Sequence, residues 1–220
     1  MQHASDEMKA YYAARAPYYD DVYLKPEREA DLSFLKTHIP NCFAGRSVLE
    51  VACGTGFWTP HIANLAASVT ATDWTPEPLN FAKLRPGVET VAFAQADAYA
   101  LPADLGRFDG AFAGLWFSHV PVASRNAFFQ SLHDRLTPGA RVLLLDNSDS
   151  QLSDLPIGEV DDDGNTYQHR QLLDGTVHRV LKNFPTSTQL SDLVAPFAAR
   201  SKHIQLENFW LFEYELKPNA

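Results

Sequence analysis

One segment of the chain indicates how it folds, and it reads Leu49-Glu50-Val51-Ala52-Cys53-Gly54-Thr55-Gly56-Phe57-Trp58-Thr59. The apolar run over residues 46–52 predicts a buried strand, and residues 58–67 predict a helix. Glycines between a strand and a helix let the backbone approach a ligand closely and leave N–H groups free to point at it. The segment therefore predicts a ligand-binding turn where a strand ends.

The same alternation of strand and helix continues along the chain. Further strands are expected over residues 68–73, 88–97, 108–115 and 140–146, and further helices over residues 75–84 and 124–136. Strands separated by helices of this length imply right-handed crossovers and parallel pairing. We therefore expect an α/β fold with a doubly wound, mostly parallel, Rossmann-like sheet and helices on both faces.

The two flanks of this core differ from it. Residues 1–40 predict a helical N-terminal lid divided by Pro17 and Pro26, residues 41–146 the ligand-binding core, residues 148–185 an inserted β-hairpin after the fifth strand, and residues 186–220 a C-terminal helix (186–200) and closing strands. Asp174-Gly175 is a strong two-residue hairpin signal. Because 220 residues fit one domain, we assign all four parts to a single domain.

The composition excludes several classes of function. Eighteen Lys and Arg against 27 Asp and Glu give a net charge of −9, which argues against nucleic-acid or anionic-membrane partners. Two cysteines, Cys42 and Cys53, cannot form a disulfide framework or a four-ligand zinc site, and the eight histidines show no short metal-ligand spacing. No apolar run is long enough for a membrane span and no signal peptide is evident, so we expect a cytoplasmic protein without a metal.

Three kinds of glycine loop can follow a strand in this way. A phosphate loop requires Gly-Lys-Ser/Thr, which is missing, and a dinucleotide fingerprint requires a glycine where Thr59 stands. The third is the loop that binds S-adenosylmethionine (SAM). Glu50-x-Ala52-x-Gly54-x-Gly56 resembles the acidic-x-Gly-x-Gly-x-Gly motif of class I SAM-dependent methyltransferases, with Ala52 in the place of the first glycine.

Other landmarks of that family occur in the same order, so that the resemblance covers about half of the chain. They are Asp73 after the second strand, Asp97-Ala98 after the third, Phe108-Asp109 at the start of the fourth, and Leu136-Thr137-Pro138-Gly139 before the fifth. The resemblance implies that Asp73 accepts hydrogen bonds from the ribose hydroxyls. It also implies that Asp97 and the Ala98 backbone contact adenine. Glu50 either contacts the ligand or orients the loop.

The N-terminal segment carries a second resemblance. Residues 11–20, Tyr-Tyr-Ala-Ala-Arg-Ala-Pro-Tyr-Tyr-Asp, resemble the first helix of many bacterial small-molecule methyltransferases. Tyr12, Arg15 and Tyr19 fall near one face of such a helix. This implies a lid with aromatic rings near the sulfonium and Arg15 or a tyrosine near the methionine carboxylate. The alternative is an ordinary amphipathic helix that packs its tyrosines.

The expected acceptor end follows the fourth strand. Ligands of open parallel sheets bind outside the carboxyl ends of the strands, which places Leu115, Trp116 and His119 near the methyl group. His119 is the candidate general base, because its pKa lies near neutrality; the alternative is a histidine that only binds backbone. Trp116, together with Tyr167 and Arg170 of the hairpin, is the candidate acceptor-binding set.

These observations predict methyl transfer from SAM to the oxygen or nitrogen of a small organic acceptor, with sulfur as the less favoured alternative and S-adenosylhomocysteine (SAH) as the product. The expected cofactor-binding residues are Tyr12, Arg15, Tyr19, Glu50, Ala52, Gly54, Gly56, Asp73, Trp74, Asp97, Ala98 and Leu115. Two alternatives stay open: a non-catalytic SAM-binding module and an enzyme that uses a modified SAM. We expect a monomer or a homodimer.

Overall fold

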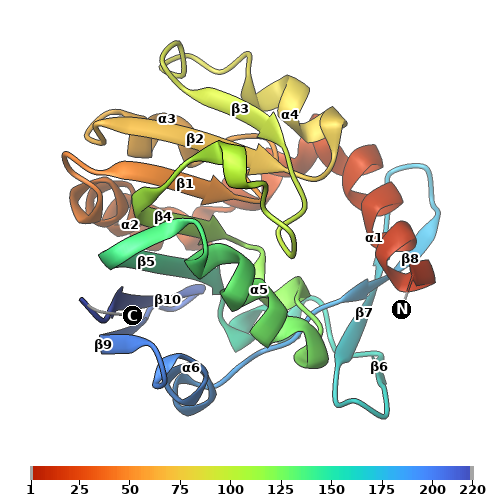
Figure 1. The fold of residues 1–220 in the computed structure, drawn as a ribbon. Coiled ribbons are helices and arrows are strands. Elements are labelled where there is room, and N and C mark those ends of the chain that lie inside the picture. The colour runs from red at the N-terminus through yellow and green to blue at the C-terminus, as the bar shows by residue number, and fades with distance from the viewer. Residues whose placement is uncertain (1, 219–220) are drawn as a thin grey trace.

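A seven-stranded sheet forms the centre of the molecule (Figure 1). The computed structural model describes residues 2–218, with side chains from residue 7 onward. The strands are β1 (Ser47–Val51), β2 (Ser68–Asp73), β3 (Ala92–Gln95), β4 (Phe108–Gly114), β5 (Leu136–Asn147), β9 (Ala198–Gln205) and β10 (Phe209–Leu216), in the order β3-β2-β1-β4-β5-β10-β9. The first five are parallel, and β10 runs antiparallel to both β5 and β9. The predicted doubly wound, mostly parallel fold is confirmed.

Helices cover both faces of the sheet. The helices of the core are α2 (Glu29–Cys42), α3 (Thr59–Ala63), α4 (Pro76–Ala82), α5 (Arg125–His133) and α6 (Ser187–Val194). On one face Leu35 of α2 and Ile62 of α3 belong to a single apolar cluster. On the other, Phe128 of α5 and Leu190 of α6 belong to a second cluster. The sheet is therefore buried from both sides, as its apolar strands require.

The N-terminal segment forms α1 (Gln2–Arg15), followed by the 3-10 helices η1 (Ala16–Tyr23) and η2 (Pro26–Arg28). Pro17 and Pro26 lie in the first turns of η1 and η2, so they divide the segment as predicted. The remaining 3-10 helices are η3 (Ala103–Leu105), η4 (Phe117–His119), η5 (Val122–Ser124) and η6 (Asp149–Ser153). No helix among the described residues is long and apolar enough to cross a bilayer.

The insertion forms a sheet of its own beside α1 (Figure 1). Its strands are β6 (Glu159–Val160), β7 (Thr166–Gln171) and β8 (Val177–Leu181). The predicted turn lies between β7 and β8: Gly175 has a φ of 87°, and Asp174 accepts a hydrogen bond from the Thr176 N–H at 2.9 Å. The short strand β6 was not predicted.

Several predicted bounds differ from those in the structure, and two of the differences change the kind of element. The helix expected over residues 186–200 ends at Val194, and Ala198 already begins β9. Pro196 has no N–H with which to continue the helix, and the residues after it pair with β10. The segment Leu136-Thr137-Pro138-Gly139, which was expected to precede the fifth strand, instead opens β5. A register shift lies between the pairs Phe108–Leu136 and Gly110–Arg141.

Candidate active site

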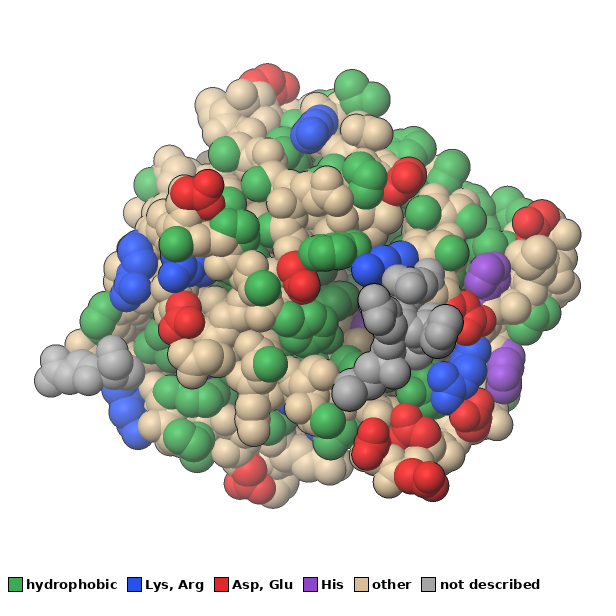
Figure 2. All heavy atoms as spheres, turned by 45° about the vertical axis from the view of Figure 1, so that its right-hand side comes forward, with side chains coloured by type: hydrophobic (Ala, Val, Ile, Leu, Met, Phe, Trp, Pro, Cys, Tyr) green, Lys and Arg blue, Asp and Glu red, His purple; other side chains and the backbone are tan. Residues whose placement is uncertain are grey.

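A cavity of about 590 Å³ lies at the carboxyl ends of the first four strands, and α1 and the β6–β8 sheet border it. Figure 2 shows hydrophobic side chains around a hollow on this face of the molecule. The predicted residues that line the cavity are Tyr12, Tyr19, Glu50, Ala52, Gly54, Asp73, Trp74, Asp97, Ala98, Leu115, Trp116, His119 and Tyr167. Gly56, Arg15 and Arg170 are not among the lining residues.

Two lining residues have unusual backbone conformations. Ala52 has a φ of 54° and Leu115 a φ of 55°, the left-handed region that residues with a side chain seldom adopt. Each follows the last residue of a strand, Ala52 after β1 and Leu115 after β4. Glycine adopts this conformation without strain, which explains why the family motif has a glycine at the position where this chain has Ala52. Strained residues of this kind cluster at functional sites.

The glycine loop is attached to Asp73 through its backbone. The Gly54 N–H donates to one carboxylate oxygen of Asp73 at 2.9 Å, and the Thr75 N–H donates to the other at 2.8 Å. Burial raises the pKa of Asp73, and these hydrogen bonds oppose the rise. A Cβ on Gly56 would lie 2.8 Å from the Cβ of Ala82 in α4. Gly56 therefore permits close packing of the loop on α4, which is why it does not line the cavity.

Glu50 lies at the end of β1 with one carboxylate oxygen, Oε2, that has no hydrogen-bond partner among the described residues. Only 2% of the residue is exposed. Burial raises the pKa of Glu50 to about 8, although the Thr59 hydroxyl and Arg85 oppose the rise. Because an unsatisfied buried acceptor is costly, this oxygen suits a cationic or N–H donor supplied by a ligand.

A clamp on the glycine loop was missed by the sequence reasoning. The Thr55 hydroxyl donates to Asp20 of η1 at 2.7 Å, and Nε of Arg85 donates to the Thr55 carbonyl at 2.5 Å. Arg85 also forms an ion pair with Asp20. Asp20 ends the tyrosine-rich motif, so the motif itself was the available signal. The clamp ties the N-terminal segment to the cofactor loop.

At the other end of the cavity, His119 contacts two elements that are distant in sequence. Its Nδ1 lies 2.5 Å from the carbonyl oxygen of Leu181 in β8, and its Nε2 lies 2.7 Å from the hydroxyl of Tyr12 in α1. A carbonyl only accepts, so Nδ1 carries the proton of the neutral ring and Nε2 accepts from Tyr12. The imidazole therefore joins α1 to the inserted sheet.

A buried ion pair lies beside His119. The Lys182 ammonium donates to Asp146 at 2.6 Å and to the Ser118 hydroxyl at 2.7 Å, and both members of the pair are almost fully buried. Burial, then Lys182 and Arg170, lower the pKa of His119 to about 3. Burial also raises the pKa of Tyr12 to about 12. The Tyr12–His119 pair is therefore neutral at pH 7.

Two arginines of the predicted set lie near this pair and form no ion pair with any carboxylate that the structure describes. Arg15 donates to the Tyr11 hydroxyl at 2.9 Å. Arg170 is 6% exposed and donates through Nε and Nη2 to Oε1 of Gln168, at 3.1 and 2.7 Å. Neither side chain lines the cavity.

The residues best able to bind a metal lie elsewhere. His38 and Cys42 of α2 and Glu213 of β10 bring three ligand atoms within 4.8 Å of one another. None of the three lines the cavity. His38 Nε2 lies 2.5 Å from Glu213 Oε1, so the two already satisfy each other as a hydrogen bond.

Comparisons with known proteins agree with this geometry. A family model described as a methyltransferase domain matches residues 48–139. The ubiquinone biosynthesis O-methyltransferase of Azotobacter vinelandii is 33% identical over 115 residues, which are 50% of this chain and 47% of that protein. The demethylmenaquinone methyltransferase of Staphylococcus epidermidis is 29% identical over 116 residues, 51% of this chain and 47% of that protein. The chain thus spans about half the length of these curated relatives.

A solved structure matches over the whole chain. The DhpI–SAH complex has a TM-score of 0.79 and 27% sequence identity, and the match covers 99% of both chains. The likeness therefore extends beyond the core to the N-terminal helices and the inserted sheet.

Proposed function

We propose that this chain is a class I SAM-dependent methyltransferase that transfers the methyl group of SAM to an oxygen or nitrogen atom of a small acceptor. The observation that carries the proposal is the cavity at the strand ends, where three acidic residues, Glu50, Asp73 and Asp97, face one space. The acceptor screen described at the end of this subsection also tests the two alternatives, a binding module without turnover and an enzyme that uses a modified SAM.

The lining residues fit SAM. The free oxygen of Glu50 suits the ammonium group of the methionine part, and the Asp73 carboxylate suits the two ribose hydroxyls. Asp97 and Ala98 form the adenine end, together with Tyr99, which the sequence reasoning did not include. When bound, SAM supplies a methyl group attached to a sulfonium sulfur. After transfer of the methyl group, that sulfur is the neutral thioether of SAH.

The protein's own contribution is alignment and exclusion of water. The loop clamp and Asp73 fix the glycine loop, while α1 and the inserted sheet enclose the acceptor end. Holding two reactants in line supplies ~7–11 kcal/mol of barrier reduction in well-oriented systems. Trp116 and Tyr167 provide apolar surface for the acceptor.

For His119 we favour positioning over base catalysis. Its Nε2 lone pair is occupied by the Tyr12 hydroxyl, and Lys182 and Arg170 oppose the addition of a proton to the ring. A general base needs a pKa near the working pH, and the pKa of His119 is far below it. Neutral His119 instead orients Tyr12 toward the cavity.

Calorimetry and a transfer assay test this function. SAM and SAH are expected to bind, while NAD and ATP bind at least tenfold more weakly, because the loop lacks both the third glycine and the phosphate-loop lysine. Screening acceptors with methyl-labelled SAM, followed by mass spectrometry, is expected to yield a methylated product. Equal affinity for NAD and SAM contradicts the cofactor assignment; SAM binding without any transfer favours the non-catalytic module.

A further inference from the structure

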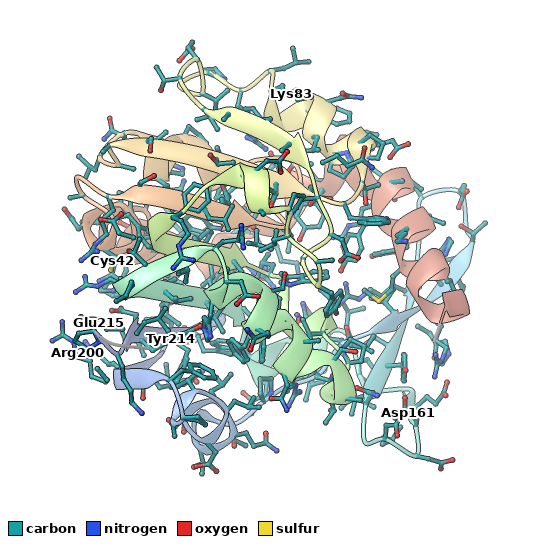
Figure 3. The ribbon with its side chains drawn as sticks, in the orientation of Figure 1. Cys42, Lys83, Asp161, Arg200, Tyr214 and Glu215 are labelled. Carbon is teal, nitrogen blue, oxygen red and sulfur yellow. The ribbon has the colours of Figure 1, made fainter. Side chains whose placement is uncertain are left out.

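Three side chains with different metal-binding atoms meet on the face of the sheet that α2 covers. His38 and Cys42 belong to α2 and Glu213 to β10, and the ligand atoms of the three lie within 4.8 Å of one another. Figure 3 shows Cys42 on the opposite side of the view from Asp161, which lines the cavity. The cluster is therefore separate from the candidate active site.

The local structure explains why these side chains converge. Residues four apart, such as His38 and Cys42, lie one turn apart on the same helix face, and Leu35 of that face is buried against the sheet. On β10, Glu213 shares a strand face with Leu211, which belongs to the same apolar cluster as Leu35. The histidines show no short spacing among themselves, which is why the sequence predicted no metal; a His–Cys pair supplies it instead.

The distances in the cluster fit a Zn²⁺ ion. Sγ of Cys42 lies 3.5 Å from Nε2 of His38. A Zn–S bond of about 2.3 Å and a Zn–N bond of about 2.0 Å at the tetrahedral angle place such atoms about 3.5 Å apart. Oε1 of Glu213 lies 2.5 Å from the same Nε2, so it has to move outward by about 0.8 Å to reach the third corner. The long side chain of Glu213 is partly exposed and can make this movement.

Thiolate, imidazole and carboxylate together suit a borderline-soft cation, and Zn²⁺ accepts all three. We propose that His38, Cys42 and Glu213 bind one Zn²⁺ ion, whose fourth position is filled by water on the partly exposed side of the cluster. The thiolate and the carboxylate supply two negative charges, which balance the charge of the ion. Because the ligands lie outside the cavity, the ion links α2 to β10 and takes no part in methyl transfer.

The contacts of the cluster show what the ion has to replace. A carboxylate only accepts, so Nε2 of His38 carries the proton of the hydrogen bond to Glu213, and this proton has to leave Nε2. Burial, followed by Glu213, raises the pKa of Cys42 to about 11, so the metal also displaces the thiol proton. Arg141 and Lys202 oppose that rise and favour the thiolate. Their positive charge also repels the ion, which limits its affinity.

Binding of the ion is coupled to folding. His38 and Glu213 are 175 residues apart in sequence, so only the folded chain brings all three ligands together. In the unfolded chain only His38 and Cys42 remain neighbours. A ligand that binds the folded state more tightly than the unfolded state stabilises the protein. Zn²⁺ should therefore raise the unfolding temperature.

Cobalt tests the site through a signature that requires a cysteine ligand, because Co²⁺–thiolate bonds absorb in the near ultraviolet. We expect the tag-free protein to gain this absorption with one equivalent of Co²⁺ and to lose it when Zn²⁺ displaces the cobalt. Cys42→Ser should show no such absorption. Cys53→Ser, which changes the only other cysteine, should keep it. Absorption that depends on Cys53, or none in the wild type, overturns the inference.

Further variants assign the other two ligands. His38→Gln and Glu213→Gln should each weaken Zn²⁺ binding at least about tenfold, measured by calorimetry. Glu215→Gln is the matched control, because Glu215 lies on the same strand but pairs with Arg200 (Figure 3), and it should bind Zn²⁺ like the wild type. Zn²⁺ should raise the unfolding temperature of the wild type and not that of Cys42→Ser. Unchanged Zn²⁺ affinity in either ligand variant overturns the inference, and these two variants decide if Cys42→Ser does not fold.

Discussion

Asp20 accepts a hydrogen bond from the hydroxyl of Thr55 at 2.7 Å, across 35 residues of sequence. The contact joins the N-terminal segment to the middle of the glycine loop, and Arg85 closes the arrangement by bonding to both partners. Thr55 is 4% exposed, so the loop is held from its buried side. The affinity for the cofactor should therefore depend on a residue that does not touch it.

Asp20→Ala tests this dependence. Because Asp20 is partly exposed, we expect a loss of about 1 kcal/mol, or roughly fivefold in the dissociation constant for SAH. Asp20→Asn keeps an acceptor for Thr55 and should lose less. The neighbouring exposed residue gives the control, Asp21→Ala, which should bind like the wild type. Equal affinities in all four proteins, measured by calorimetry, contradict a role for the clamp.

Asp73→Ala should weaken SAH binding by about 1.5–3 kcal/mol, the scale of hydrogen bonds to a charged group. The variant also leaves the Gly54 and Thr75 N–H groups without their acceptor, so its stability is measured in parallel. Asp97→Ala should lose less, because the Ala98 backbone contact with adenine remains. A folded Asp73→Ala protein with an unchanged dissociation constant removes Asp73 from the site.

Glu50 should make SAH binding depend on pH. Its pKa of about 8 in the free protein means that the carboxyl group is largely protonated at pH 7. Pairing with an ammonium group favours the ionised form, so binding releases up to one proton and tightens by at most about tenfold per pH unit as the pH rises toward 8. Calorimetry in two buffers with different ionisation enthalpies measures this proton. The Glu50→Gln variant should release no proton when SAH binds. Proton uptake by the wild-type protein on binding would contradict the pairing of Glu50 with the ammonium group.

His119→Gln separates positioning from base catalysis. If His119 only orients Tyr12, kcat should fall by less than about tenfold, because glutamine keeps a donor and an acceptor. The pKa of about 3 also predicts a flat wild-type rate between pH 6 and 8, where His119 stays neutral. A fall of 10²-fold or more, with loss of an acid limb that the wild type shows, would establish it as the base.

Ala52→Gly should stabilise the protein. A residue with a side chain costs roughly 1–2 kcal/mol in the left-handed region, and glycine costs roughly 0.5–1 kcal/mol in entropy, so the net gain is about 0.5–1 kcal/mol. Urea denaturation measures it. Ala113→Gly, at a buried position in β4 that has no positive φ, should destabilise instead. A loss of stability in Ala52→Gly would show that the strain is relieved by other contacts.

The strands of the core were predictable because each is a short apolar run bounded by turn residues, as residues 68–73 show: β2 has those bounds. The start of strand β9 was assigned to the preceding helix because most residues of β9 are exposed and polar, so that its pairing with β10, rather than its own pattern, makes it a strand. The helix predicted over residues 186–200 therefore included residues that pair with β10.

The cavity-lining residues that directly follow strand ends, such as Ala52 and Leu115, were predictable because the order of the strands places them at one edge of the sheet. The environment of His119 was not, because its two partners lie 107 and 62 residues away in sequence. The burial of Lys182 was also missed, since charges in a hairpin are usually solvated. Only the folded arrangement, which brings the residue after β8 beside the end of β5, gives Lys182 its partner Asp146.

Helix α1 covers both ends of the cavity at once. Lys9 lies 4.4 Å from the ring centroid of Trp74 beside the glycine loop, Glu7 accepts from the Arg179 N–H of β8, and Tyr12 holds His119. We therefore expect a single displacement of this helix to expose both occupants together. The lifetime of the closed state would set a common residence time for the two products, and each turnover would require one such opening.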